Sequence, residues 1–136
     1  MYSAEKIFEF NPAYPSCHGS TIAELPNGDL LAAWYAGSRE GAKDVAIFTA
    51  RRFYGNEGWT EPEKVIKTPD GSEGNPVLFV DVADAVWLFH VTMYGDSWTQ
   101  CKLRYQKSNT LGYSWDDNVI LREELGWMTR AKPVYL

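Results

Sequence analysis

The sequence contains few cysteines and no clustered metal ligands. Its 136 residues include only Cys17 and Cys101, without C-x-x-C spacing, and only two histidines, His18 and His90, which lie 72 positions apart (90 minus 18). This pattern argues against a disulfide framework and against a zinc site, so we expect no metal. Free thiols suit a reducing compartment such as the cytoplasm, and the localisation is otherwise left open.

Long apolar runs, basic runs and helical periodicity are also missing. No stretch approaches the ~20 consecutive apolar residues of a membrane-spanning helix. The first ten residues, M-Y-S-A-E-K-I-F-E-F, show neither the basic start nor the apolar core of a signal peptide. With 13 basic and 18 acidic residues, the formal net charge is −5. We therefore expect neither a membrane nor a nucleic acid as partner, and without a phosphate-loop or dinucleotide motif we expect no cofactor.

Aromatic residues, by contrast, are abundant. They make up 15% of the chain and include 6 Trp and 8 Tyr, within a hydrophobic content of 45%. A chain of this length and composition is globular and long enough to bury one core. Its aromatic content is typical of β-sheets and of sugar-binding surfaces.

The apolar residues follow the pattern of strands joined by turns. Residues 18–37 contain a P-N-G-D turn at 26–29 between two apolar runs. This predicts a β-hairpin, because Asn-Gly supplies the positive φ angles of a tight turn. A third strand, buried on both faces, is expected at 45–52, and a short edge strand at 64–67.

The same order of strands and turns then occurs again, with strands expected at 74–81, 85–93, 101–108 and 118–122. Equivalent anchors are separated by 56 or 57 residues: Trp59 and Trp115 (115 minus 59 is 56), Leu31 and Trp87 (56), Ile22 and Leu78 (56), and Phe48 and Tyr105 (57). A third copy begins at Arg130, because Pro133 follows Pro76 by 57 positions. Four-stranded repeats of about 40 to 50 residues are typical of β-propeller blades.

We therefore predict an all-β fold. It is a β-propeller fragment with two four-stranded antiparallel blades, at approximately 18–68 and 74–122, and the first strand of a third blade at approximately 129–136. A blade buries its faces only against neighbouring blades, so at least three are expected for stability.

The stretch 107–116, K-S-N-T-L-G-Y-S-W-D, combines a glycine, several short hydroxyl side chains and a tryptophan anchor. It resembles the Asp box of sialidases and related β-propellers, S-x-D-x-G-x-T-W, with Ser108, Gly112 and Trp115 in register. Thr110 stands where the family has Asp, and a hydroxyl in place of a carboxylate is expected to weaken the hydrogen bonds inside the turn. The alternative interpretation is an ordinary hairpin with a buried Trp.

A longer resemblance covers nearly the whole chain. Four segments resemble the sialidase-like BNR-repeat family: C-H-G-S-T-I-A-E-L-P-N-G-D-L-L-A-A-W-Y-A-G-S-R-E-G-A-K-D-V-A-I, G-N-P-V-L-F, V-W-L-F-H and R-A-K-P-V-Y-L. The resemblance implies the N-terminal third of a six-bladed propeller, within a group that includes exo-sialidases and other sialidase-like glycosidases, some of them secreted. It also implies a carbohydrate partner, and either missing C-terminal blades or closure of the ring as a homo-oligomer.

The resemblance also implies a candidate catalytic loop. In sialidases an acid/base Asp and a carboxylate-binding Arg lie after the second strand of the first blade, which matches residues 38–44 here. Arg39 suits a bidentate pair with a substrate carboxylate, and Asp44 or Glu40 suits proton donation. Asp44 is the preferred donor because the buried strand 45–52 follows it directly, whereas Glu40 is easier to solvate. The alternative is a solvated loop whose charges neutralise one another.

The start of the first blade departs from the family. The family's first Arg, in an F-R-I-P motif, is replaced here by C-H-G-S at 17–20. His18 is therefore a candidate for binding a carboxylate or hydroxyl, or for acting as a base in a lyase. A hydrogen-bonded structural His is the alternative.

Two further pairs of residues are candidates for substrate binding. The second blade's corresponding loop offers Asp96 and Trp98, whose indole ring suits the face of a sugar. Arg130 and Lys132 begin the innermost strand of the third copy, where they suit contact with an acidic sugar. A packing role for Trp98, and a wet channel for the two cations, are the alternatives.

Three functions compete on these observations. The first is the N-terminal part of a sialidase-like glycoside hydrolase acting on an acidic or related sugar, inactive alone because the nucleophilic Tyr and its paired Glu lie in further blades. The second is a non-catalytic carbohydrate-binding module in which chains close a propeller by oligomerisation. The third is a uronic-acid polysaccharide lyase that uses His18 with a Tyr.

Overall fold

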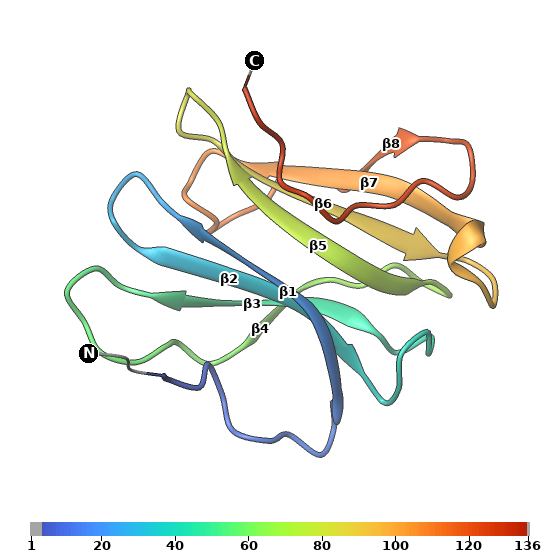
Figure 1. Cartoon of the computed structure of the whole chain (residues 1–136), viewed down its shortest axis with the longest axis horizontal. Coiled ribbons are helices and arrows are strands. Elements are labelled where there is room, and N and C mark those ends of the chain that lie inside the picture. Colours follow the sequence, from blue (N-terminus) through green and yellow to red (C-terminus); the bar gives the residue numbers. More distant parts are fainter. Residues whose placement is uncertain (1–3, 136) are drawn as a thin grey trace.

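The computed structural model describes residues 4–135 and contains two four-stranded antiparallel sheets in chain order (Figure 1). Sheet one consists of β1 (Ser16–Glu24), β2 (Leu30–Gly37), β3 (Ala46–Arg52) and β4 (Glu63–Ile66), and sheet two of β5 (Ser72–Val80), β6 (Val86–Met93), β7 (Cys101–Ser108) and β8 (Val119–Arg122). The prediction of an all-β fold with two such sheets is confirmed.

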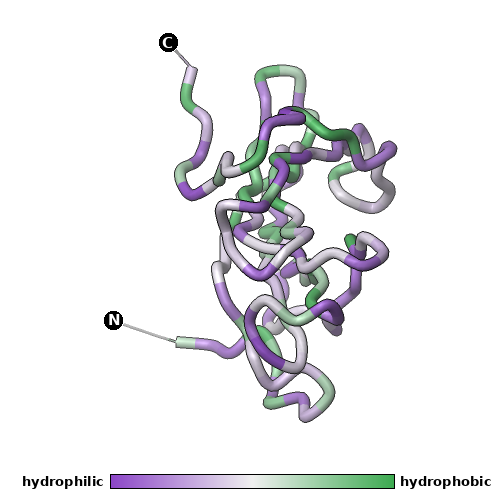
Figure 2. The backbone as a smooth tube through the Cα atoms, turned by 90° about the vertical axis from the view of Figure 1, so that its right-hand side faces the viewer, coloured by the Kyte–Doolittle hydropathy of each residue, from purple (hydrophilic) through white to green (hydrophobic). Residues whose placement is uncertain are grey.

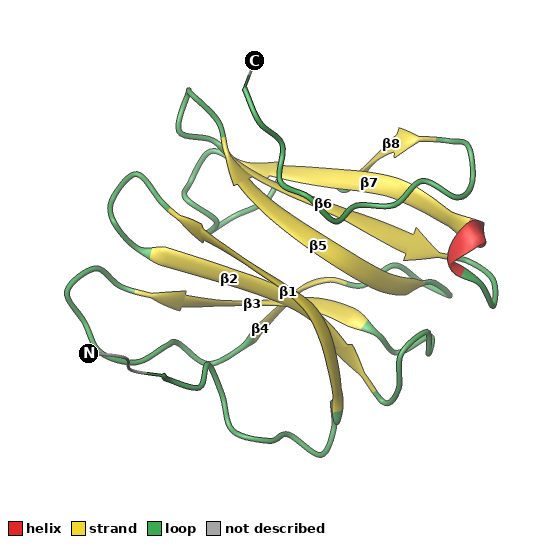
Figure 3. Ribbon diagram, viewed as in Figure 1, coloured by secondary structure: helices red, strands yellow, loops and turns green. Residues whose placement is uncertain are grey.

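Helix is confined to a single 3-10 turn within residues 4–135. This turn, η1 (Trp98–Gln100), is drawn in red between β6 and β7 in Figure 3. Over the same described range, no helix has the length and apolar character that crossing a membrane requires.

The predicted P-N-G-D hairpin joins β1 to β2. Gly28 adopts a φ of 83°, which a residue with a side chain rarely adopts. Its amide donates to the Leu25 carbonyl at 2.8 Å, and the Leu25 amide donates to the Asp29 carbonyl at 2.8 Å. The Asn-Gly signal in the sequence therefore fixes where the two strands reverse.

Backbone irregularities repeat along with the strands. β1 and β5 are each bulged near their beginning, where the pairing register with the next strand shifts. Inside the two bulges, Gly19 and Asn75 have positive φ angles of 59° and 46° and are 56 positions apart (75 minus 19). Because a bulge bends its strand, the first strand of each sheet is bent at the same point.

The main core lies between the two sheets. Leu31 and Ile47 of sheet one pack in one cluster with Leu78 and Leu88 of sheet two, and the last three of these are 0% exposed. In Figure 2, hydrophobic segments gather toward the middle of the molecule and hydrophilic ones lie mainly on turns and ends. Burial of apolar area between the sheets is the main force that holds them together.

The outer faces of the sheets differ in how they are covered. On sheet one, Phe8 of the N-terminal segment stacks on Trp34 with ring centroids 5.1 Å apart. On sheet two, Trp87 stacks on Phe89 at 5.9 Å and lies 5.4 Å from Tyr105, and all three rings stay partly exposed. The outer face of sheet two therefore consists of aromatic rings that mainly cover one another.

The box-like turn between β7 and β8 is closed by hydroxyl groups. Ser108 Oγ accepts from the amides of Thr110 at 3.2 Å and Gly112 at 2.8 Å. Thr110 Oγ1 accepts from the Ser114 amide at 2.9 Å. The hydroxyl at the family's Asp position thus still closes the turn, but with a neutral acceptor in place of a charged one.

The turns 25–29 and 109–118 lie at the same end of the two sheets, which we call the turn end. Arg51 links the sheets there. Its Nη1 lies 3.0 Å from Asp29 Oδ2, and each of these side chains is 6% exposed. Its Nη2 donates to the Leu111 carbonyl, and its guanidinium carbon lies 4.2 Å from the centroid of the Tyr113 ring. A buried ion pair of sheet one therefore holds the box-like turn of sheet two.

Residues 130–135 do not form the strand that the sequence predicts at 129–136. The segment runs beside β5: Thr129 Oγ1 donates to the Asn75 carbonyl, and the Val82 amide donates to the Tyr135 hydroxyl, each at 2.7 Å. A strand needs a ladder of backbone hydrogen bonds to a neighbour, and none of residues 4–129 provides one. Leu136 lies outside the described residues.

Candidate functional site

The loops after β2 and β6 meet at the end opposite the turns, which we call the loop end (right in Figure 1). They border a cavity of about 310 Å³ lined by Arg39, Glu40, Gly41, Met93, Asp96 and Trp98. A Cβ added to Gly41 would lie 3.2 Å from the Met93 methyl carbon, which shows how closely the loops approach. Four residues selected from the sequence, from loops 56 positions apart, thus line one cavity.

Asp44 closes its own loop. Its two carboxylate oxygens accept from the Ser38 amide and the Ser38 hydroxyl, both at 3.0 Å. Asp44 also borders an adjoining cavity of about 410 Å³, which Asp96 shares. Because both oxygens of Asp44 are engaged in the loop itself, this carboxylate is less free to serve as a proton donor than the sequence suggested.

Glu40 is held by a residue that we did not select from the sequence. The Tyr35 hydroxyl, on β2, donates to Glu40 Oε1 at 2.9 Å. Burial raises the pKa of Tyr35 to about 12, with further contributions from the hydrogen bond to Glu40 and its negative charge. Tyr35 therefore stays protonated at neutral pH and acts as a donor.

The sequence did carry one signal for Tyr35. Its equivalent in the second copy is Val91 (91 minus 35 is 56), which is fully buried. Tyr35 carries a hydroxyl group where Val91 has only methyl groups. This difference indicates that the side chain of Tyr35 forms a hydrogen bond in addition to packing in the core.

His18 lies at the loop end but outside the cavity of Arg39 and Glu40. Its ring stacks on Tyr35 with centroids 5.6 Å apart, and its Nε2 lies 2.8 Å from Ser16 Oγ. The side chain is exposed. His18 is therefore both hydrogen-bonded and accessible to solvent.

Trp98 forms one wall of the cavity. Its ring lies edge-on to Tyr35 at 6.3 Å and is partly buried. A Cβ on Gly74 would lie 2.7 Å from the indole, so the glycine makes room for it. Asp96 is exposed, and its backbone amide donates to the Gln100 side chain at 3.0 Å.

Arg130 and Lys132 line a different cavity, of about 520 Å³, together with the bulges of β1 and β5 around Gly19 and Asn75. Lys132 Nζ donates to the Ile22 carbonyl. Arg130 lies near enough to Tyr35 to counteract part of the rise in the pKa of Tyr35. The two cations therefore flank the loop-end site without bordering the cavity of Glu40 and Trp98.

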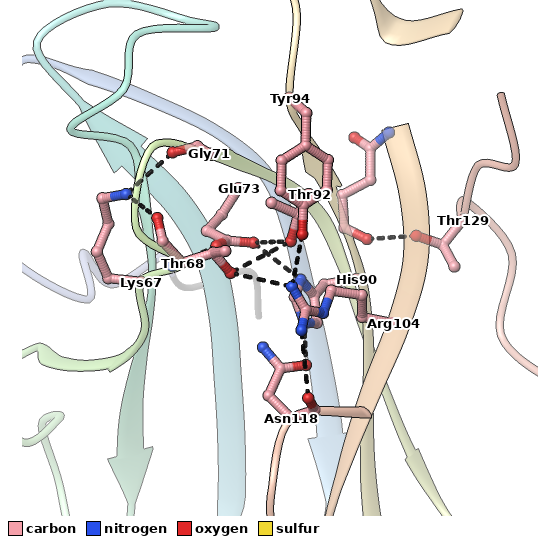
Figure 4. A network of polar contacts seen from close by, with 11 residues as sticks. Lys67, Thr68, Gly71, Glu73, His90, Thr92, Tyr94, Arg104, Asn118 and Thr129 are labelled. Carbon is pink, nitrogen blue, oxygen red and sulfur yellow. Dashed lines mark hydrogen bonds and ion pairs between the residues drawn. The ribbon is translucent and has the colours of Figure 1, made fainter. Parts of the chain in front are cut away.

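A buried polar network lies beneath the loop end (Figure 4). His90 Nδ1 lies 3.0 Å from Glu73 Oε2, with both side chains 0% exposed, and His90 Nε2 lies 3.0 Å from Asn118 Oδ1. Burial by itself raises the pKa of Glu73, but the interaction with His90 and the hydrogen bonds from Thr68 outweigh burial and lower it. His90 is thus a fully buried core residue placed between a carboxylate and an amide side chain.

The network also ties the connection between the sheets to sheet two. The Thr68 amide donates to Glu73 Oε1 at 2.7 Å, and Thr92 Oγ1 donates to Glu73 Oε2 at 2.8 Å.

Across residues 4–135, no group of three or more His, Cys, Asp or Glu side chains gathers as metal ligands do.

Consecutive four-stranded antiparallel sheets, packed face to face with equivalent loops at one end, define a β-propeller type of fold. The chain belongs to the BNR repeat-like domain family, which matches residues 28–135. The family resemblance and the fold expected from the sequence are confirmed.

Solved structures share this fold. The Hadza microbial sialidase Hz136 matches with a TM-score of 0.70 at 13% identity, over 80% of this chain and 26% of that one. A protein of unknown function from Dyadobacter fermentans matches with 0.70 at 14% identity, over 93% and 45%. Zg3597, a family 117 glycoside hydrolase from Zobellia galactanivorans, matches with 0.61 at 17% identity, over 85% and 42%.

At these identities the likeness establishes the fold alone. The chain spans 26% to 45% of the length of these three structures. Comparison with curated proteins gives no match.

Proposed function

We propose that this chain is part of a sialidase-like glycoside hydrolase and that it binds an acidic or related sugar at the loop end. One observation carries the proposal: Arg39, Glu40, Asp96 and Trp98, from two equivalent loops, line one cavity of about 310 Å³. A cation, two carboxylates and an aromatic wall are the groups that an acidic sugar needs for binding and for proton transfer.

Each side chain has a distinct role in this proposal. Trp98 offers an apolar face for stacking against the sugar ring, and Arg39 pairs with the sugar's carboxylate. Glu40 replaces Asp44 as the preferred proton donor, because Asp44 already accepts two hydrogen bonds from Ser38. General acid catalysis by one positioned carboxyl group contributes about 10² to 10⁴ in rate.

The second candidate function is a lyase acting on uronic-acid polysaccharides. It is favoured by the stacking of exposed His18 on Tyr35 at 5.6 Å, because such a lyase pairs a base with a tyrosine. The raised pKa of Tyr35 speaks against a phenolate base and leaves His18 as the base.

Binding is tested by calorimetric titration of the chain with N-acetylneuraminic acid, galacturonic acid and neutral galactose. We expect saturable binding of an acidic sugar, weakened about tenfold by Arg39→Ala, since a hydrogen bond to a charged group is lost. Arg52→Ala, at the turn end, is the matched control and leaves binding unchanged. Equal binding of galactose and the acidic sugars, or none at all, contradicts the proposal.

Turnover is tested with fluorogenic acidic glycosides on the protein that carries the remaining blades. Glu40→Gln is expected to lower kcat by 100-fold or more, while Glu24→Gln on exposed β1 leaves it unchanged. A larger loss of kcat for Asp44→Asn than for Glu40→Gln returns the donor role to Asp44. Ultraviolet-absorbing unsaturated products, abolished by His18→Ala, instead identify the lyase.

A further inference from the structure

Tyr35 contacts residues of the loop-end site, although it belongs to a core strand. It lies near the end of β2, is 4% exposed, and packs in the cluster between the sheets. The centroid of its ring lies 5.6 Å from that of His18, which stacks on it, and 6.3 Å from that of Trp98, which meets it edge-on. It therefore touches candidate residues from both sheets while its own position is fixed by the core.

Two glycines make room for this arrangement. A Cβ on Gly19 would lie 2.6 Å from Tyr35 Cε1, and a Cβ on Gly74 would lie 2.7 Å from the Trp98 ring. These glycines stand on the first strands of the two sheets. A larger residue at either position would displace an aromatic ring, so the backbone of both sheets accommodates the pair.

The Tyr35 hydroxyl is directed at one oxygen of Glu40. It donates to Oε1 at 2.9 Å, and no hydrogen bond from residues 4–135 reaches Oε2. The loop that carries Glu40 is closed on itself by Asp44 and Ser38, which fixes its shape. The bond from Tyr35 ties that loop to the core strand β2.

We infer that Tyr35 is a positioning residue, which orients the Glu40 carboxylate so that its Oε2 atom faces the sugar. This inference rests on the proposed function for the role of Glu40. The inference adds that the Glu40 carboxyl group is oriented by a neutral hydrogen-bond donor on a core strand. A buried, rigid donor orients a carboxylate better than a mobile surface group, because the donor loses no conformational freedom on binding.

The first test needs no ligand. Tyr35→Phe keeps the ring and removes the hydroxyl, while Glu40→Ala removes the acceptor. Amide hydrogen exchange of residues 39–43 is expected to rise about tenfold in either variant, and no further in the double variant, because one bond is removed from its two sides. Tyr54→Phe, an exposed tyrosine at the turn end, is the matched control with unchanged exchange.

The second test measures whether the bond acts on the ligand. The affinity for N-acetylneuraminic acid is determined by calorimetry for the wild type, Tyr35→Phe, Glu40→Ala and the double variant. Tyr35→Phe is expected to weaken binding about tenfold when Glu40 is present and less than twofold when Glu40 is Ala. A purely structural role for Tyr35 would produce equal losses in both backgrounds.

The outcomes separate the two proposals. The positioning role is overturned if amide hydrogen exchange of residues 39–43 is the same in Tyr35→Phe and in the wild type. It is also overturned if the increases in exchange caused by Tyr35→Phe and Glu40→Ala add up in the double variant. If exchange rises as expected but no acidic sugar binds to any form, Tyr35 still orders the loop and the proposed function fails. If binding losses are equal with and without Glu40, orientation of Glu40 toward the ligand is overturned.

Discussion

The turn end and the loop end of the sheet pair use charged side chains in different ways. At the turn end, Arg51 and Asp29 are each 6% exposed and pair at 3.0 Å, so their charges serve the contact between sheets. At the loop end, Arg39, Glu40 and Asp96 are exposed and border a cavity. Buried charge therefore forms a structural link in this molecule, whereas the exposed charges border the cavity at which we propose that a sugar binds.

The largest expected effect tests the link at the turn end. Arg51→Ala leaves the Asp29 carboxylate buried without its cation and frees the Leu111 carbonyl, so we expect a loss of about 3 kcal/mol in the free energy of unfolding. The measurement is urea denaturation followed by tryptophan fluorescence. Arg52→Ala, whose side chain is 38% exposed, is the control and should cost less than about 1 kcal/mol. Similar losses for both would remove the distinction between the ends.

A smaller effect comes from acid, through the buried network under the loop end. The pKa of Glu73 is lower in the folded chain than its usual value, so the stability it contributes is present above that usual value and is lost as pH falls through the folded pKa. We expect unfolding free energy to decline at acidic pH, and to decline less in Glu73→Gln. The loss is smaller than for Arg51→Ala because the Thr68 bond also suits a neutral carboxyl group. Parallel pH profiles of both proteins would contradict it.

The two loops at the loop end provide a third comparison. Asp44→Ala removes two hydrogen bonds to Ser38 and is expected to cost about 1 kcal/mol. Asp96→Ala is the matched change, and should cost less than about 0.5 kcal/mol because within residues 4–135 its carboxylate accepts no hydrogen bond. Thermal unfolding of the two variants measures the difference. A more destabilised Asp96→Ala would make Asp96 the structural residue.

The smallest effect concerns the box-like turn. Thr110→Asp restores the family's carboxylate, which accepts the Ser114 amide as a charged acceptor, and we expect a gain of about 0.5 kcal/mol. Differential scanning calorimetry against wild type measures it. A destabilised Thr110→Asp would show that the turn has adapted to the hydroxyl.

Local patterns in the sequence were sufficient to predict the strands and to predict that the two site loops lie at the same end of the molecule. Alternation and turn residues such as Gly28 are short-range signals, and the 56-residue register relates loop 38–44 to loop 94–100. Since neighbouring blades present equivalent loops at the same edge, the register predicts that these loops lie at one end.

Contacts that depend on packing were not accessible from the sequence. Arg51 stands in an A-R-R strand end, and its contact with Leu111, 60 positions later, exists only because the sheets pack face to face. The hydroxyl of Tyr35 distinguishes it from Val91 in the second copy, but its bond to Glu40, like the engagement of Asp44 by Ser38, depends on how one loop folds back. The missing strand at 130–135 has a similar cause, because strand formation needs a partner as well as a propensity.

The links at opposite ends of the sheet pair have a mechanical consequence. Two packed sheets that are linked at only one end can rotate apart about that link. Sheets that are linked at both ends resist such a rotation. Arg51 of sheet one holds the box-like turn of sheet two at the turn end, and near the loop end the Glu73 amide of β5 donates to the carbonyl of Val45, which directly precedes β3, at 3.4 Å. We therefore expect any change in the width of the cavity of Glu40 and Trp98 to come from the loops 38–44 and 94–100 and not from rotation of one sheet against the other.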